Sequence, residues 1–125
     1  MPIDATRPYD DTNVFARILR AEIPTTFVYE DEWAVAFHDI APQAATHILV
    51  IPRGPYVSWD DFSARASADE IAGFVRAVGT VARSRGLVAT GYRLLANTGG
   101  DGGQEVPHLH VHLFGGEPLG RMIAR

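Results

Sequence analysis

The chain contains no cysteine, which excludes disulfide bonds, thiolate metal sites and a cysteine nucleophile. It also has no apolar run of the length that a membrane span needs. Basic residues are few, since 11 Lys and Arg against 15 Asp and Glu leave a formal net charge of -4, which disfavours binding to nucleic acid or to a membrane surface. Residues 1–7 lack the basic and then apolar order of a signal peptide, so we expect a cytoplasmic protein.

Length and composition predict one globular domain over residues 1–125. The chain is 46% hydrophobic and 21% charged, as is usual for a domain that folds around a single core. Residues 1–10 carry two prolines and several polar side chains, and we expect a loose N-terminal arm there. We expect residues 115–125 to form a C-terminal tail without regular structure.

Two helices are predicted from local signals. The first follows Asp11 or Thr12 as N-cap and has an apolar face of Phe15, Ile18 and Leu19. The second begins at Ser67, which forms a capping box with Glu70, and ends near Gly86. We expect residues 52–66 between them to be irregular.

Short runs of β-branched, aromatic and alternating residues predict strands. The expected strands cover residues 26–30, 33–38, 47–51, 92–96 and 107–114, and a glycine-dense loop covers 97–104. Strands joined by short turns, with a long helix inserted, are typical of α+β proteins. We therefore predict a sheet of about five antiparallel strands with the helices on one face.

Three histidines alternate with apolar residues near the end of the chain, at His108, His110 and His112. Successive side chains of a strand point to opposite faces, so the three imidazoles are expected to share one face. The opposite face carries the apolar residues Leu109, Val111 and Leu113. This pattern predicts a strand that packs on the core through one face and presents a functional site on the other.

The residues alone leave three interpretations of the histidine face open. It could bind zinc or iron, although no carboxylate stands at an evident ligand spacing. It could attack phosphorus, since a neutral imidazole is a good nucleophile near pH 7 and the amides of the glycines at 99–103 could approach an anion. It could also form an anion or nucleotide pocket that performs no chemistry.

The run 108–114 matches the histidine triad signature, His-x-His-x-His followed by two apolar positions. Further segments match the same family in the same order, at 15–24, 36–44, 46–52, Asn97 and 102–106. Over nearly its whole length after residue 10, the chain resembles the histidine triad nucleotide-binding proteins, the Hint branch of the histidine triad (HIT) superfamily. The resemblance implies a homodimer in which two five-stranded sheets join across a two-fold axis and the tail reaches the partner's site.

The resemblance also implies an enzyme that hydrolyses the P–N bond of purine nucleoside 5'-phosphoramidates without metal or cofactor. His110 corresponds to the nucleophile that forms a covalent nucleotidyl intermediate. His112 and His47 correspond to residues that contact the phosphoryl oxygens or the leaving group, and the carbonyl of His108 orients the ring of His110. A dinucleoside polyphosphate hydrolase of the same superfamily and a non-catalytic nucleotide-binding adaptor are the alternatives.

The resemblance further implies how the nucleotide is bound. Asp39 corresponds to a residue that accepts hydrogen bonds from the ribose, and Asn97 to one near the phosphate. In Glu105 this chain departs from relatives that have serine near the leaving group, which leaves its leaving-group preference open. The other implied binding residues are His38 and Ile40 beside the sugar and base, Phe15, Ile18, Phe37 and Leu49 around the purine, and Gly103 and Gln104 in the glycine loop.

Overall fold

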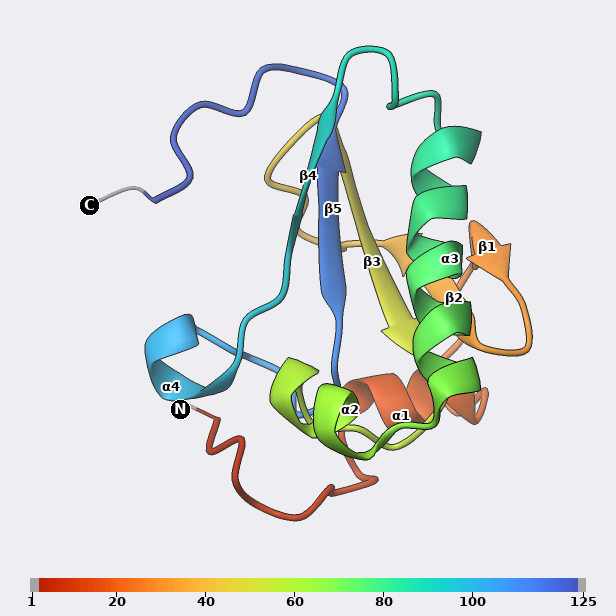
Figure 1. Ribbon diagram of the computed structural model, residues 1–125, viewed down its shortest axis with the longest axis vertical. Coiled ribbons are helices and arrows are strands. Elements are labelled where there is room, and N and C mark those ends of the chain that lie inside the picture. Colours follow the sequence, from red (N-terminus) through yellow and green to blue (C-terminus); the bar gives the residue numbers. More distant parts are fainter. Residues whose placement is uncertain (1–2, 124–125) are drawn as a thin grey trace.

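A computed structural model describes residues 3–123, and its centre is one antiparallel sheet (Figure 1). The strand order is β1-β2-β3-β5-β4, and every neighbouring pair is antiparallel. The strands are β1 (Tyr29–Glu30), β2 (Ala34–His38), β3 (Thr46–Pro52), β4 (Tyr92–Leu95) and β5 (Val111–Gly115). The predicted α+β class and five-stranded antiparallel sheet are therefore confirmed.

Four helices accompany the sheet: α1 (Val14–Leu19), α2 (Trp59–Arg65), α3 (Ala68–Ser84) and α4 (Gly99–Gly102). The capping box of Ser67 and Glu70 begins α3 as predicted, and Gly86 follows its end with a left-handed φ of 72°. No helix within residues 3–123 is long and apolar enough to cross a membrane.

Two segments expected to lack regular structure contain short helices. The prediction of an irregular 52–66 was wrong, because Ser58 accepts a hydrogen bond from the amide of Asp61 and so caps α2. The glycine loop contains the single turn α4, which ends where Gly103 takes a left-handed φ of 77°. The residue that caps α1 is Asn13, not Asp11 or Thr12, and its side chain accepts from the amide of Ala16 at 2.9 Å.

Two strands are shorter than predicted. The expected strand at 26–30 is reduced to Tyr29–Glu30, and the histidine strand begins at Val111 instead of Pro107. Before Val111 the backbone leaves the sheet, because the amide of Leu109 donates to the carbonyl of Tyr56 at 2.8 Å. His108 and His110 therefore lie on an extended segment beside the sheet, and only His112 lies on β5 itself.

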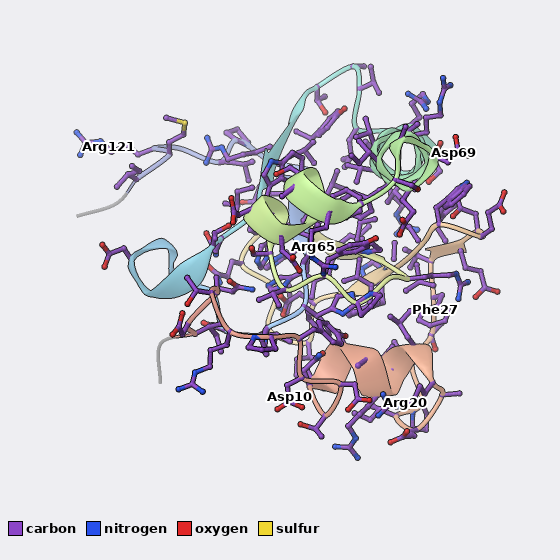
Figure 2. All side chains as sticks on the ribbon, turned by 60° about the horizontal axis from the view of Figure 1, so that its bottom comes forward. Asp10, Arg20, Phe27, Arg65, Asp69 and Arg121 are labelled. Atoms are coloured by element: carbon purple, nitrogen blue, oxygen red, sulfur yellow. The ribbon has the colours of Figure 1, made fainter. Side chains whose placement is uncertain are left out.

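The sheet is covered on both faces, so the expectation of helices on one face was wrong. On one face, α3 packs on alternate residues of β2, β3 and β5, such as Ala36, Ile48 and Leu113. On the other, α1 packs on the intervening residues, such as Phe37 and Leu49. Figure 2 shows the two helices on opposite sides of the strands, with Asp69 marking the start of α3 and Asp10 and Arg20 flanking α1.

The segments beyond the sheet have different surroundings. Residues 116–123 follow β5 without helix or strand and extend away from the sheet (Figure 1), and Arg121 in Figure 2 lies on this segment. The described part of the N-terminal arm runs below the strands in the view of Figure 1 to reach α1, and Tyr9 of this arm contacts His108. The first two residues of the predicted arm and the last two of the predicted tail lie outside the described residues.

Candidate active site

A cleft of about 590 Å³ opens between α1, β2 and the segment before β5. It lies on the face of the sheet that α1 covers only in part, which is also the face that carries His112. Ten residues expected at the site line it: Phe15, Ile18, Phe37, His38, Asp39, Ile40, Leu49, Glu105, His110 and His112. One end of the cleft is therefore apolar, and the other carries imidazoles and carboxylates.

Other lining residues could not be identified from local patterns. The segment after α1 contributes Ile23, Pro24, Thr25 and Thr26, and Val14 and Val106 complete the wall. This segment turns at Ala21, a non-glycine residue with a left-handed φ of 60°. The sequence could not predict this turn, because alanine disfavours a positive φ.

His110 has a defined tautomer with a free ring nitrogen. Its ring is 6% exposed and lies edge-on to Phe15, with ring centroids 5.0 Å apart. A carbonyl oxygen can only accept, so the 2.7 Å contact between His110 Nδ1 and the carbonyl of His108 places the proton on Nδ1. The Nε2 atom of His110 therefore keeps its lone pair, as a nucleophile requires.

His108 lies behind His110, fully buried. Its Nε2 donates to the carbonyl of Pro52 at 2.9 Å, so its Nδ1 must accept the hydrogen bond from the hydroxyl of Tyr9 at 2.6 Å. Tyr9 was not among the predicted site residues, because it belongs to the arm that was expected to be loose. The contact anchors the end of the arm to the residue whose carbonyl orients His110.

A second chain of hydrogen bonds defines the tautomers of His47 and His112. The backbone amide of Gln43 donates to His47 Nδ1 at 3.1 Å, which leaves the proton of His47 on Nε2. That proton is donated to His112 Nδ1 at 2.9 Å, so the proton of His112 is on Nε2. The cleft thus has a free acceptor on His110 and a free donor on His112, with ring centroids 5.1 Å apart.

Burial keeps the imidazoles neutral. Loss of solvent lowers the pKa of His108 and of His112 from 6.5 to about 4, and repulsion between neighbouring imidazoles contributes to both shifts. The pKa of His110 and that of His47 are also lowered by burial, against an opposing pull from the carboxylate of Asp39. At neutral pH all four rings are therefore uncharged, in the form that the two hydrogen-bond chains require.

A carboxylate does lie within ligand distance of two imidazoles, which sequence spacing did not reveal. Asp39 Oδ2 is 3.4 Å from His47 Nε2, and one ligand atom each from Asp39, His47 and His112 lie within 4.8 Å of one another. The register of β2 and β3 brings them together, since Asp39 directly follows β2 and its amide bonds the carbonyl of His47. Nitrogen and oxygen ligands of this kind suit a divalent metal ion.

Three of the expected binding residues do not line the cleft. The side chain of Gln104 turns inward and is 3% exposed, and its amide donates to the carbonyls of Val57 and Val106. Gly103 is the exposed residue that ends α4, and the backbone of Asn97 packs beside Gly102 of the same turn. The glycine segment folds onto itself as a helical turn, which the hydrogen bond from the amide of Gly99 to Gln104 Oε1 closes at 3.0 Å.

Comparison with known proteins places this sheet and its histidines in one family. The model of the HIT domain matches residues 20–119. A HIT-like protein of Azospirillum brasilense is 63% identical over 119 residues, which cover 95% of this chain and 98% of that one. The purine nucleoside phosphoramidase of Escherichia coli is 43% identical over 114 residues, which cover 91% of this chain and 95% of that one.

Solved structures agree with this assignment. A HIT family hydrolase from Clostridium thermocellum has a TM-score of 0.82 at 37% identity, with 91% of this chain and 98% of that chain covered. The chain belongs to the HIT family, and its relatives in that family include hydrolases.

The lowered pKa values predict a specific response to acid. An imidazole that ionises at 6.5 when unfolded and near 4 when folded stabilises the fold fully above pH 6.5, and this contribution is lost as the pH falls toward 4. For His108 the shift corresponds to roughly 3 kcal/mol. We expect the free energy of unfolding to decrease over this range in urea titrations. Titration of His108 and His112 near pH 6.5 by NMR would contradict this account.

Substitution of Tyr9 by Phe is expected to lower stability and to change the environment of His108 Nδ1. It leaves the buried Nδ1 of His108 without a donor, a loss of about 1–3 kcal/mol in the free energy of unfolding. The proton of His108 stays on Nε2, which still donates to the carbonyl of Pro52, but the 15N chemical shift of Nδ1 should change because that atom loses its hydrogen bond. The matched control is Tyr29→Phe, which removes a hydroxyl that bonds Asp31 away from the histidines. Equal effects of the two substitutions would show that the Tyr9 contact has no special role.

Proposed function

We propose that this chain hydrolyses the P–N bond of purine nucleoside 5'-phosphoramidates and releases a nucleoside monophosphate and an amine. The observation that carries the proposal is the pairing of the free Nε2 acceptor of His110 with the free Nε2 donor of His112 at one end of an apolar cleft. The 43% identity to a purine nucleoside phosphoramidase supports the same substrate class.

The first chemical step is attack by His110. Its Nε2 lone pair forms a bond to the α-phosphorus while the bond from phosphorus to the amine nitrogen breaks, and the amine takes a proton from solvent as it leaves. The Nδ1–H of His110 continues to donate to the carbonyl of His108, which stabilises the positive charge on the phosphorylated ring. The Nε2–H of His112 donates to a phosphoryl oxygen, and His47 holds that ring in place.

Water then completes the reaction. It attacks the phosphorus of nucleotidyl-His110, the bond from phosphorus to Nε2 breaks, and His110 regains its lone pair. The products are the nucleoside monophosphate and free enzyme, and the protons of the water pass to solvent. Two displacements of moderate difficulty thus replace one difficult displacement.

The nucleoside occupies the other end of the cleft. Asp39 Oδ1 accepts from the amide of Ala41 at 2.8 Å, which holds the carboxylate in position to accept hydrogen bonds from ribose hydroxyls. Phe15, Phe37 and Leu49 form a buried apolar wall suited to the face of a purine. This division of the cleft matches the division of the substrate into a polar phosphoryl and an aromatic base.

The charge of the cleft favours a phosphoramidate over a dinucleoside polyphosphate. Within the described residues its wall contains no arginine, and the chain has no lysine, whereas Asp39 and Glu105 both line it. A polyphosphate brings several negative charges to this wall, but a phosphoramidate brings one. A nucleotide-binding adaptor would bind the nucleotide without turning it over. Measurements of turnover therefore distinguish this alternative from the proposed enzyme.

A divalent metal ion is a second candidate occupant of the site. The ligand atoms of Asp39, His47 and His112 favour it, because they lie within 4.8 Å of one another. Metal binding there competes with the hydrogen bond from His47 to His112. Activity that requires a metal would therefore be lost with a chelator, and activity through the hydrogen-bonded imidazoles would not.

Substitution of His110 by Ala is expected to lower turnover by several orders of magnitude while affinity for AMP changes little, because the nucleophile is lost and the binding walls remain. The measurement is release of a fluorescent amine from an adenosine 5'-phosphoramidate, with and without excess EDTA. An alkaline quench followed by mass spectrometry should detect nucleotide on the peptide containing His110. Near-normal turnover in the variant would remove His110 from this role, and loss of wild-type turnover in EDTA would favour the metal.

We also propose that the chain functions as a homodimer joined through β4. This strand lies at the edge of the sheet, and its Tyr92 and Leu94 are 39% and 46% exposed. They form an apolar groove with exposed Trp59 and Val75 of α2 and α3. A second copy related by a two-fold axis can pair its own β4 with this edge and cover both grooves, which removes an exposed edge strand.

Substitution of Leu94 by Arg is expected to convert the dimer to a monomer, because it places a charge in the groove beside the edge strand. Val88→Arg is the matched control, since Val88 is 60% exposed and lies outside the groove. Sedimentation velocity at micromolar concentration should show dimers for the wild type and the control. A monomeric wild type, or a dimeric Leu94→Arg variant, would contradict the assignment of this interface.

A further inference from the structure

Glu105 contributes an exposed negative charge to the catalytic end of the cleft. It lines the cleft together with His110 and His112, and it is exposed to solvent. None of the ion pairs within residues 3–123 involves it. Its charge acts on His110, where it opposes the effect of burial on the pKa of that ring. The carboxylate thus belongs to the same cleft wall as His110 and His112, where a group bound at the phosphoryl end would meet its charge.

Within residues 3–123 of one chain, no arginine lines the cleft beside Glu105, and the chain has no lysine. The imidazoles of His110 and His112 are uncharged at neutral pH, because burial lowers the pKa of each. On α1 and just after it, Arg17 and Arg20 pair with Glu22, at 3.6 Å and 2.5 Å, outside the residues that line the cleft. Asp39 adds a second negative charge. The cleft thus combines a phosphoryl-binding end with an uncompensated negative field.

A cation on the substrate would complete this charge arrangement, and only one part of the substrate can carry it. The nucleoside is neutral and the phosphoryl group is negative, so the positive group must belong to the amine. We propose that Glu105 selects phosphoramidates whose leaving amine carries a second, positively charged group, such as a diamine or a basic amino acid. This inference rests on the proposed phosphoramidase function and names the leaving group for that same site.

The size of the effect follows from the exposure of Glu105. Opposite charges in contact near a protein surface attract enough for roughly a tenfold difference in binding, and salt weakens the attraction. An interaction that holds substrate and transition state equally lowers KM and leaves kcat unchanged. We therefore expect the selection to be seen in KM at low salt and to be reduced in 0.5 M salt, a concentration at which surface charges are largely screened.

The test uses three adenosine 5'-phosphoramidates with leaving amines of matched length, namely propylamine, 1,3-diaminopropane and β-alanine. For the wild type, kcat/KM is expected to be about tenfold higher for the diamine than for propylamine, and lowest for β-alanine. In Glu105→Gln the ratios of kcat/KM between the three compounds are expected to approach those that the leaving-group ability of each amine alone would give. Asp101→Asn is the matched control, because Asp101 is an exposed carboxylate in α4 that does not line the cleft, and it should keep the wild-type ratios.

Two outcomes overturn the selection by Glu105: equal ratios in the wild type and Glu105→Gln, or equal loss of selectivity in Asp101→Asn. Failure of the phosphoramidase function is a separate result, seen as no release of any of the three amines by the wild type. Calorimetry gives the dissociation constants of the three compounds for His110→Ala. These constants measure the preference for a charged amine in the absence of turnover. Tighter binding of the diamine compound there that is lost when Glu105→Gln is added supports the role of Glu105, and equal binding of the three compounds, or a preference that persists in the double variant, overturns it.

Discussion

The site depends on one constraint, which is that backbone groups determine where each imidazole carries its proton. The carbonyls of Pro52 and His108 can only accept, and the amide of Gln43 can only donate. Two chains of hydrogen bonds begin at these groups and leave an acceptor on His110 and a donor on His112. Because the fold fixes these backbone groups in β3, in the loop before it and in the segment before β5, the chemical state of the cleft is a direct consequence of the fold.

Burial makes this arrangement stable and also makes it sensitive to acid. An imidazole that is removed from water loses the hydration of its charged form, so its pKa falls and it stays neutral at physiological pH. His108 is the most deeply buried of these imidazoles, and both of its ring nitrogens are hydrogen-bonded. Tyr9 supplies one of those bonds, which connects the N-terminal arm through His108 to His110.

The two-sided packing of the sheet explains where the cleft lies. The long helix α3 covers one face along much of its length, whereas α1 has only six residues and covers part of the other. The uncovered part of that face is apolar near Phe37 and Leu49 and polar near His112. The proposed substrate, with an aromatic base and a phosphoryl group, has the same two parts.

Local sequence was sufficient for much of the fold. The capping box at Ser67, the apolar stripe of α3 and the alternation through 108–113 are short-range patterns, and they correctly indicated the long helix, the antiparallel sheet and which strand residues face the core. The triad and its flanking segments also indicated the family, and ten of the expected site residues line one cleft. The errors concern shorter elements, such as α2 and α4, where a single cap or glycine turn decides the conformation.

The sequence by itself determined the residue types available for chemistry, the extended segment that carries the histidines and the family to which the chain belongs. Tertiary structure decided which atoms meet. The contact between Tyr9 and His108 joins residues 99 positions apart, and the approach of Asp39 to His47 depends on strand register. Gln104 looked like a site residue in the sequence and is buried in the structure. Such contacts depend on how distant segments pack, and local propensity carries no information about that packing.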